Sequence, residues 1–237
     1  MYPTLHILGA NISTYRLMFA LGVAAMILLL CLRRSRYRLS LVQAILSGLL
    51  LAVFGVIGAK LLFIAENWRT VLQSGITPGG MSFFGTVFLL PAILALTAPL
   101  FRMRPLAFID YCTPAVPLML AVMRIGCFFT GCCGGVSITL AGATFPLPVQ
   151  LFECALDFLI LDVMLQIEKK HGPSGALYPL FMLLYGIVRF LLEFFRMTEK
   201  VLLRLSNGQY FSILCIVFGG LLLFRLKRKF INSSGSD

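Results

Sequence analysis

Long apolar stretches separated by short polar connections dominate the pattern of this chain. A helix that crosses the hydrocarbon core of a bilayer needs about 20 consecutive, predominantly apolar residues. Stretches of roughly this length lie at 14–32, 41–65, 81–100, 106–129, 149–167, 176–196 and 208–224. Because a helix satisfies its own backbone hydrogen bonds inside lipid, the pattern predicts an all-α, polytopic membrane protein with seven transmembrane helices.

The polar connections predict the orientation of these helices. Lysine and arginine follow the first, third, fifth and seventh segments, at Arg33, Arg34, Arg36, Arg38, Arg102, Arg104, Lys169, Lys170, Arg225, Lys227, Arg228 and Lys229. Cytoplasmic loops are enriched in Lys and Arg. We therefore expect the N-terminus outside and the C-terminus in the cytoplasm, which puts the connections at 77–85, 130–150 and 197–207 on the outer face.

No second domain is expected. Neither a basic n-region nor a small-residue cleavage site precedes the first apolar segment, so we predict no cleavable signal peptide. Neither a linker nor an internal repeat interrupts the chain. We expect one transmembrane domain over 1–237, in which 230–237 form a disordered polar tail.

Composition supports a lipid environment. Hydrophobic residues make up 59% of the chain, charged residues only 12%, and the mean hydropathy is +0.96. A soluble domain carries about 25% charged residues. The net charge of +11 sits in short clusters between apolar segments, which indicates orientation in the membrane and contact with anionic lipid. We therefore expect no nucleic-acid partner.

Charged residues inside the predicted helices are the first candidates for function. A charge at membrane depth is costly and by default marks a functional site. Such residues are Lys60, Asp110, Arg124, Glu153, Asp157, Asp162, Arg189 and Glu193. The i, i+4 spacing of Tyr185, Arg189 and Glu193 puts them on one helical face, continued by Arg196. An ion pair that only ties helices together remains an alternative for this polar stripe.

Two of these charges indicate an anion site. Arg124 and Arg189 lie on segments that could pack together, and a guanidinium binds phosphate in a fork geometry. A phosphate inside a bilayer belongs to a phospholipid. The glycine-rich stretch after Arg124 could add backbone N–H donors. The residues alone thus predict a site for a lipid headgroup near the outer interface, without naming a reaction.

Metal chemistry is not expected. The seven cysteines form no C-x-x-C pattern, and most lie in apolar segments, where cysteine packs as a small hydrophobic residue. Adjacent Cys132 and Cys133 are interpreted as loop packing rather than a redox pair. Only two histidines, His6 and His171, are present, so a histidine-rich metal site is not predicted. No cofactor is predicted either.

Eight motifs in order resemble those of the prolipoprotein diacylglyceryl transferase family. They are T-Y-R-L-M-F-A-L-G (14–22), G-A-K-L-L-F (58–63), G-G-M-S-F-F-G (79–85), D-Y-C-T-P (110–114), R-I-G-C-F-F-T-G-C-C-G-G (124–135), V-Q-L-F-E (149–153), Y-G-I-V-R-F-L-L-E-F-F-R (185–196) and N-G-Q-Y-F-S (207–212). The resemblance implies a bacterial inner-membrane enzyme. Such an enzyme transfers the diacylglyceryl group of phosphatidylglycerol to the lipobox cysteine of a prolipoprotein signal peptide and releases glycerol phosphate.

The resemblance also implies roles for individual residues. Arg124 and Arg189 match the arginines that hold the phosphate, and Tyr185 and Glu193 match further catalytic positions. Substrate-binding positions match Tyr15, Asp110, Gly126, Gly131, Gly135 and Gln150.

Phe84 departs from the family pattern. The pattern reads G-G-M-S-F-H-G, and its histidine is a candidate for deprotonating the acceptor thiol. Phenylalanine cannot accept a proton, so Glu193 is the hypothesised base. General-base catalysis contributes about 10²–10⁴-fold, and some acceptor thiol is already ionised at neutral pH, so transfer without the histidine is physically possible.

Two alternatives to transfer to prolipoproteins stay open. One is a catalytically altered paralogue that binds phospholipid. The other is a related transferase with another lipid donor or acceptor. A seven-helix transporter or receptor is disfavoured by the order of the motifs, and a transporter would tend to have repeated halves, which the sequence lacks.

Overall fold

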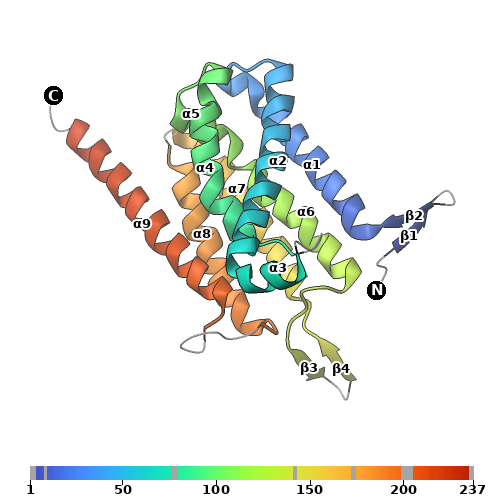
Figure 1. The fold of residues 1–237 in the computed structure, drawn as a ribbon. Coiled ribbons are helices and arrows are strands. Elements are labelled where there is room, and N and C mark those ends of the chain that lie inside the picture. Colours follow the sequence, from blue (N-terminus) through green and yellow to red (C-terminus); the bar gives the residue numbers. More distant parts are fainter. Residues whose placement is uncertain are drawn as a thin grey trace. The chain divides into compact units, whose positions relative to one another are not determined.

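The computed structural model describes residues 4–7, 10–75, 80–140, 143–171, 175–198 and 205–234. The chain is mainly helical and divides into two compact units, whose elements Figure 1 labels. The first unit comprises Met1–Met26, Thr113–Gly172 and Ala176–Asp237, and the second comprises Ile27–Cys112 and Pro173–Gly175. Because the two units interleave along the chain, this division does not decide whether 1–237 is a single domain, and that expectation stays a prediction.

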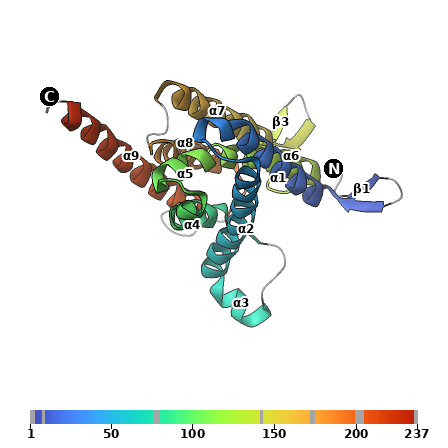
Figure 2. The same ribbon diagram turned by 90° about the horizontal axis from the view of Figure 1, so that it is seen from above.

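In the described residues, the first unit consists of the start of α1, helices α6 to α9, the short helix η3 and two hairpins. Its elements are β1 (Thr4–Ile7), β2 (Ala10–Ser13), α1 (Thr14–Arg33) as far as Met26, α6 (Ala115–Thr130), β3 (Ser137–Leu140), β4 (Ala143–Pro146), α7 (Val149–His171), α8 (Leu177–Leu192), the short helix η3 (Glu193–Phe195) and α9 (Asn207–Ser234). Helix α7 packs against α6 and α8, and α8 packs against α9 (Figure 2).

The helices α8 and α9 approach each other closely because glycines line their contact. A Cβ on Gly186 would lie 2.9 Å from the Ser212 carbonyl oxygen, and one on Gly219 would lie 2.7 Å from the Pro179 carbonyl oxygen. Small residues allow helix backbones to approach in lipid, where packing rather than the hydrophobic effect drives association.

The second unit contains the end of α1 and the helices that follow it. Its further elements are η1 (Arg34–Tyr37), α2 (Leu41–Glu66), α3 (Trp68–Ser74), α4 (Phe83–Thr97), η2 (Ala98–Phe101) and α5 (Pro105–Cys112). Helix α4 packs against α2 and α5. The N-terminus of α2 is fixed by a capping box, in which Ser40 and Gln43 exchange hydrogen bonds.

Backbone contact at two glycines joins α2 to α4. A Cβ on Gly85 would lie 2.0 Å from the Gly58 carbonyl oxygen, and a Cβ on Gly58 would lie 2.8 Å from the Gly85 oxygen. Thr86 adds a hydrogen bond from its hydroxyl to the Gly55 carbonyl at 2.6 Å. Glycine in G-A-K-L-L-F and in G-G-M-S-F-F-G thus has a packing reason that is independent of catalysis.

Arg33 is buried, although its position suggested a solvated cluster. Its guanidinium donates to the carbonyl oxygens of Asp110 and Tyr111 at the end of α5. It also lies 5.7 Å from the ring centroids of both Tyr37 and Tyr111. Cations are favourable at helix C-termini, so Arg33 acts as a structural cap within the second unit.

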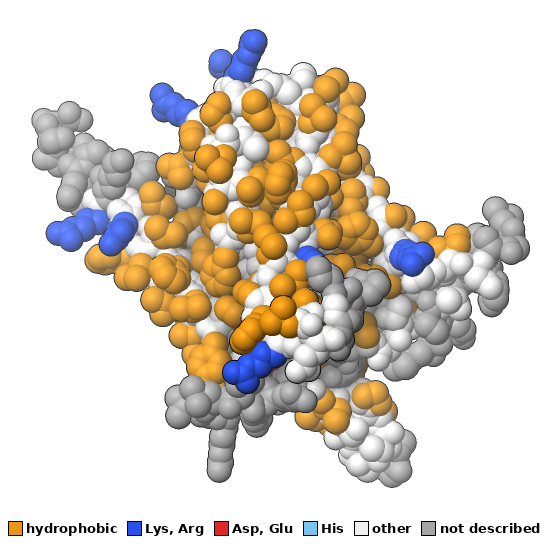
Figure 3. Space-filling view, in the orientation of Figure 1, with side chains coloured by type: hydrophobic (Ala, Val, Ile, Leu, Met, Phe, Trp, Pro, Cys, Tyr) orange, Lys and Arg blue, Asp and Glu red, His pale blue; other side chains and the backbone are white. Residues whose placement is uncertain are grey.

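Six helical stretches in the described residues are long and apolar enough to cross a membrane: Thr14–Tyr37, Leu41–Glu66, Phe83–Phe101, Pro105–Thr130, Leu177–Phe195 and Asn207–Arg228. They match six of the seven expected segments. The remaining segment, 149–167, is helix α7, whose acidic residues Glu153, Asp157, Asp162 and Glu168 lower its apolar character. Figure 3 shows the broad hydrophobic surface that membrane helices present to lipid.

Local details differ from the sequence-based expectations. The fourth segment is interrupted between α5, which ends at Cys112, and α6, which begins at Ala115, because the intervening Pro114 disrupts a continuous helix. Two hairpins, one before α1 and one between α6 and α7, occupy positions for which no strands were predicted. Helix α9 continues to Ser234, so the expected tail at 230–237 is helical over most of its length. The last three residues, 235–237, lie outside the described part.

Candidate functional site

Glu153 is the centre of a buried ion-pair cluster in the first unit. It projects from the first turns of α7, where its Oε2 lies 2.6 Å from Nε of Arg124 on α6. Its Oε1 pairs with Arg189 on α8 and lies 3.0 Å from NH1 of Arg196. One carboxylate on α7 therefore holds three guanidinium groups, one from α6 and two from α8 and the residue after η3.

A second carboxylate continues the cluster. Glu193 Oε2 lies 2.9 Å from NH2 of Arg189, as expected from their i, i+4 spacing. Its Oε1 accepts a hydrogen bond from the Ser206 hydroxyl at 2.9 Å. The Nε of Arg196 lies farther away, 4.0 Å from Glu193 Oε2. The predicted pairing of Arg189 with Glu193 is therefore confirmed, with Glu193 in η3 and Arg196 directly after it.

The cluster is nearly dry and carries excess positive charge. The side chains of Arg124, Arg189 and Arg196 are only 14%, 12% and 9% exposed. Three guanidinium charges against the carboxylates of Glu153 and Glu193 leave one positive charge when the neighbouring Asp157 carboxyl is protonated. Buried charges interact more strongly than exposed ones because less water screens them. Such a surplus favours an anion.

Two further polar side chains border the arginines. Asp157, one turn beyond Glu153 on α7, is 2% exposed and interacts electrostatically with Arg124 and Arg189. It forms no hydrogen bond or ion pair among the described residues. Tyr185, one turn before Arg189 on α8, is also 2% exposed and interacts with both arginines. Burial of a polar group costs free energy unless it is hydrogen-bonded or paired, and polar residues at membrane depth are candidates for function.

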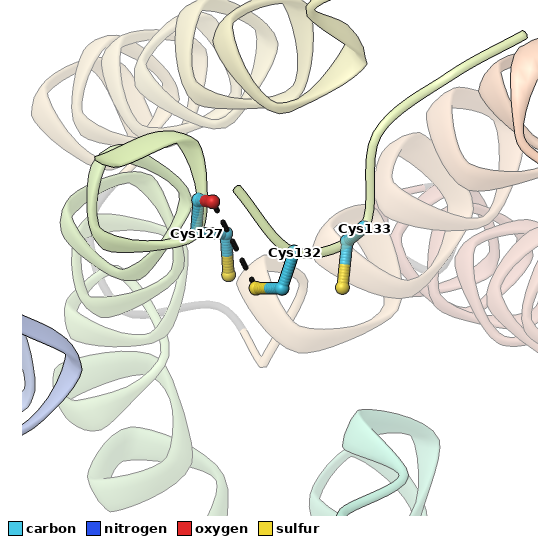
Figure 4. Close-up of side chains that lie close together, drawn as sticks. All are labelled: Cys127, Cys132 and Cys133. Carbon is cyan, nitrogen blue, oxygen red and sulfur yellow. Dashed lines mark hydrogen bonds between the residues drawn. The ribbon is translucent and has the colours of Figure 1, made fainter. Parts of the chain in front are cut away.

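A tight turn follows α6 and brings three cysteines together (Figure 4). Gly131 ends the helix with φ 75°, and its N–H donates to the Phe128 carbonyl while Cys132 N–H donates to the Cys127 carbonyl. This pair of bonds is a Schellman motif, which places Cys132 over Cys127. The sulfur atoms of Cys127, Cys132 and Cys133 all lie within 4.8 Å of one another.

Cys133 is the unusual member of this turn. Its φ of 60° is left-handed, a conformation that costs a residue with a side chain about 1–2 kcal/mol. A hydrogen bond from the Cys127 thiol, helped by the charges of Arg196 and Arg124, lowers the pKa of the Cys133 thiol to about 5. The cysteines therefore lie beside the arginine cluster. Tyr15 at the start of α1 also interacts electrostatically with the three cysteines and Arg124.

The three predicted glycines have steric roles. Gly131 takes the left-handed cap position described above. A Cβ on Gly126 would lie 2.8 Å from Met18 Cβ, and one on Gly135 would lie 2.5 Å from Val149 Cγ2. The N–H groups of Gly131 and Gly135 donate to protein carbonyls, so these two donors are already used. Contact of the glycines with substrate stays a prediction.

Gln150 fixes the turn to α7. Its Nε2 donates to the Cys132 carbonyl at 2.7 Å, and the residue is only 4% exposed. Its Oε1 has no hydrogen-bond partner among the described residues. A buried acceptor without a partner is costly, so this oxygen could receive a donor from a ligand.

Two residues singled out by the sequence belong to the second unit. The Asp110 carboxylate, fully buried, accepts a hydrogen bond from the Gly175 N–H at 2.6 Å. Its predicted contact with substrate stays a prediction. Phe84, at the start of α4, is 5% exposed and stacks on Phe88 with ring centroids 6.5 Å apart. Its surroundings accommodate an apolar ring.

Sequence reasoning missed the central role of Glu153 and the meeting of the three cysteines. Glu153 was noted only as a costly charge in a predicted helix and as the end of V-Q-L-F-E. Its i, i+4 relation to Asp157 was a signal that one face of α7 is polar. The spacing of Cys127 and Cys132 across a helix end followed by glycine was the signal for a Schellman contact.

The chain is similar to a known protein family and to individual proteins that belong to it. A family model described as prolipoprotein diacylglyceryl transferase matches residues 3–225. Phosphatidylglycerol–prolipoprotein diacylglyceryl transferase 2 of Clostridium perfringens is 27% identical over 94% of this chain and 93% of its own length. The corresponding transferase of Nitrosomonas europaea is 31% identical over 89% and 84%. That of Idiomarina loihiensis is 34% identical over 64% and 62%.

Proposed function

Because the chain belongs to the prolipoprotein diacylglyceryl transferase family, we propose that it transfers the diacylglyceryl group of phosphatidylglycerol to a lipobox cysteine in the bacterial inner membrane. The observation that supports this most is the convergence of Arg124, Arg189 and Arg196 on Glu153. A buried, positively charged cluster on membrane-spanning helices can bind the phosphate of a phospholipid headgroup.

Arg124 and Arg189 hold the phosphate in this proposal. Arg124 approaches Glu153 through Nε, and its two terminal nitrogens make no hydrogen bond among the described residues. They can therefore reach a phosphate oxygen without breaking the existing ion pair. Glu153 and Arg196 act as positioning residues, because they fix the guanidinium groups before substrate arrives. Preorganised donors of this kind are the main source of electrostatic stabilisation in enzymes.

The transfer step follows from this arrangement. The cysteine sulfur of the prolipoprotein forms a bond to the glyceryl carbon that carries the phosphate. The bond between that carbon and the phosphate oxygen breaks, and glycerol phosphate leaves with the electron pair. Negative charge grows on the leaving oxygen, where a guanidinium stabilises it. The thiol proton must go to a base or to water.

The base hypothesised from the sequence is poorly suited to that task. Glu193 is held by Arg189 and by the Ser206 hydroxyl, and donors that stabilise a carboxylate weaken it as a base. Asp157 is buried beside Arg124 and has no such donors among the described residues. We therefore assign Asp157 as the better protein base, with Glu193 as a positioning residue. Changing Asp157→Asn should slow transfer more than Glu193→Gln at equal folded yield.

An assay of transfer tests the role of the cluster. Purified protein, phosphatidylglycerol vesicles and a lipobox peptide are mixed, and mass spectrometry detects a diacylglyceryl adduct on the peptide cysteine. Arg124→Ala should lower the rate about 10²–10³-fold, the usual loss when one transition-state donor is removed. Arg225→Ala, an exposed arginine on α9, is the matched control and should keep the wild-type rate. Equal rates for the two variants would contradict the assignment.

Phe84 supports a second candidate function. Its buried, stacked ring provides no proton acceptor at the position where the family pattern has histidine. The chain could then bind phosphatidylglycerol without transferring from it. Intact lipid bound in an Arg124-dependent manner, with no adduct after prolonged incubation, would favour this function over transfer.

A histidine at position 84 distinguishes transfer from lipid binding without transfer. If transfer is limited by proton removal, Phe84→His should raise the rate, by up to about 10²-fold at the low end of general-base effects. Phe84→Leu, which keeps an apolar side chain, is the control and should leave the rate low. An unchanged rate in the histidine variant would count against a missing base as the limit.

A further inference from the structure

We propose that Cys127, Cys132 and Cys133 bind a zinc ion, and that its open fourth position receives the acceptor thiol. The three sulfur atoms lie within 4.8 Å of one another, and Figure 4 shows them gathered at the turn after α6. The first part of the proposal stands on this geometry alone. The second part rests on the proposed function.

The sulfur spacing fits a tetrahedral ion with small adjustments. With Zn–S bonds of about 2.3 Å, neighbouring sulfurs of a tetrahedral site are about 3.8 Å apart. Closing the observed spacing to that value needs movements of about 1 Å or less per atom, within the reach of side-chain torsions. All three cysteines are free thiols in the structure, so no disulfide has to be broken first.

The backbone of the turn holds the three cysteines in place. The Schellman bonds of Gly131 and Cys132 fix the contact with Cys127. Gln150 anchors the Cys132 carbonyl from α7, and the Thr130 hydroxyl, which donates to the Gly126 carbonyl at 2.9 Å, lies 3.4 Å from Cys132 sulfur. Donors behind the ligands are typical of metal sites, where they orient the first-shell atoms.

Cys133 provides a second, independent argument. Packing of a Schellman turn explains the contact of Cys127 with Cys132. It does not explain the φ of 60° at Cys133, where glycine would have a lower conformational energy. Backbone strain of this kind is found most often at functional sites. The strained conformation brings the third sulfur to the other two, which converts a pair into a three-ligand set.

Access and charge are consistent with an ion that exchanges a ligand. Cys132 and Cys133 are exposed, whereas Cys127 is 6% exposed, so an ion can be reached from one side. Three thiolates around Zn²⁺ carry one net negative charge, which the nearby Arg124 and Arg196 offset. Three protein ligands and one open position are the arrangement of catalytic rather than structural zinc.

The open coordination position would activate the acceptor thiol, which the apolar Phe84 side chain cannot do. A thiol that coordinates zinc is held as its thiolate, and its proton passes to Asp157 or to water. The sulfur then bonds to the glyceryl carbon while glycerol phosphate departs with the electrons of the broken carbon–oxygen bond. The neutral thioether binds zinc more weakly than a thiolate, so the product can leave. No oxidant or reductant is required.

Metal binding is tested first, without any transfer. The full-length protein in detergent is reduced, freed of metal with a chelator, incubated with Zn²⁺, desalted and analysed for zinc content. We expect about one zinc per chain, as a single site requires. Cd²⁺ in place of Zn²⁺ should give an ultraviolet thiolate-to-metal charge-transfer band. Cys132→Ser and Cys133→Ser, both at exposed positions, should weaken binding at least about tenfold, because they remove a ligand and even loss of a hydrogen-bond partner behind a ligand costs about 10–100-fold.

The matched control is Cys31→Ser, a cysteine in α1 outside the cluster, which should retain the zinc and the band. Helical circular dichroism checks that each variant is folded. Zinc content that is equal in Cys132→Ser and Cys31→Ser would overturn the site. A disulfide among the three cysteines in protein purified without reductant, together with no zinc uptake after reduction, would also overturn it and indicate a redox pair.

Transfer is measured second, with zinc-free and zinc-loaded wild-type protein. We expect zinc-loaded protein to transfer at least about tenfold faster, a modest share of the 10²–10⁴-fold typical of thiol activation by a base. Equal rates would overturn the role in activation while the proposed function stands. Stoichiometric zinc without any adduct in either form would uphold the metal site while the proposed function fails.

Discussion

Glu153 sets the geometry of the candidate site because each of its carboxylate oxygens faces a different set of arginines. Oε2 pairs with Arg124, and Oε1 is shared by Arg189 and Arg196. A single carboxylate in the middle of three guanidinium groups offsets the electrostatic repulsion among them. At the scale of one residue, the cluster therefore depends on a side chain that does not itself have to touch substrate.

Neutralising this carboxylate should be costly. Glu153→Gln leaves Arg124 and Arg189 without their shared counter-charge, and removing one partner of a buried ion pair typically costs about 3–5 kcal/mol. We expect a lower unfolding temperature in detergent and a loss of transfer. Asp162→Asn, an exposed carboxylate on the same helix, should change stability by no more than about 0.5 kcal/mol. Equal unfolding temperatures for both variants would contradict the central position of Glu153.

The acidity of Cys133 gives a pH-dependent prediction. Because the pKa of this thiol is lowered to about 5, it is a thiolate at neutral pH and becomes protonated only as the pH falls through that value. In metal-free protein, alkylation of Cys133 by iodoacetamide, mapped by mass spectrometry, should stay near its plateau from pH 8 to pH 6. A rate that instead declines around pH 8.5, the ordinary range for cysteine, would show that the Cys127 thiol and the arginines do not stabilise the thiolate.

At the scale of elements, glycine contacts decide how closely the helices of each unit pack. Gly85 on α4 touches the backbone of α2 at Gly58, and Gly186 on α8 touches α9. The sequence shows glycines in these motifs but does not show which backbone each one meets. Glycine in a family motif can therefore be mistaken for a ligand-binding residue when its role is helix packing.

The contact of α4 with α2 can be tested by one methyl group. Gly85→Ala puts a Cβ 2.0 Å from the Gly58 oxygen, and overpacking of this kind costs about 1–3 kcal/mol. Gly55→Ala lies in the same interface but meets only Thr86 Cγ2 at 3.5 Å, an ordinary contact. We expect Gly85→Ala to lower the unfolding temperature and Gly55→Ala to keep or raise it. A stable Gly85→Ala variant would mean that the two helices can separate without loss.

The elements also show how far the sequence could predict the structure. Apolar length predicted the long helices, and i, i+4 spacing predicted the pair of Arg189 and Glu193, because both patterns are local. The meeting of Arg124 with Arg189 was only a possibility, since it depends on how α6, α7 and α8 pack. Glu153 as their bridge was not predicted, because nothing local links residue 153 to residues 124 and 189. The hairpins were missed because their strands are only four residues long.

At the scale of the whole molecule, charge outside the apolar helices predicts orientation. Lysine and arginine gather in alternate connections, from Arg34 to Lys229, and such clusters favour the cytoplasmic side. This orientation puts the turn at 131–135 on the outer face. There it would meet a prolipoprotein whose signal peptide has crossed the membrane.

Reporter fusions test this orientation. Green fluorescent protein fused after Asp237 should fluoresce, because the C-terminus is predicted to lie in the cytoplasm, where the reporter folds. Alkaline phosphatase at the same position should be inactive, since it needs the oxidising outer side to form its disulfides. The reverse pair of results would invert the predicted topology and place the cysteine turn on the cytoplasmic face.

Transfer with loss of glycerol phosphate at the arginine cluster is the central proposed property of this protein. The most direct measurement incubates wild-type protein with phosphatidylglycerol and a lipobox peptide and quantifies the peptide adduct and free glycerol phosphate together. We expect one glycerol phosphate for each diacylglyceryl thioether, and neither product when the peptide cysteine is replaced by serine. Bound phosphatidylglycerol without either product, or an adduct that retains phosphorus, would contradict it.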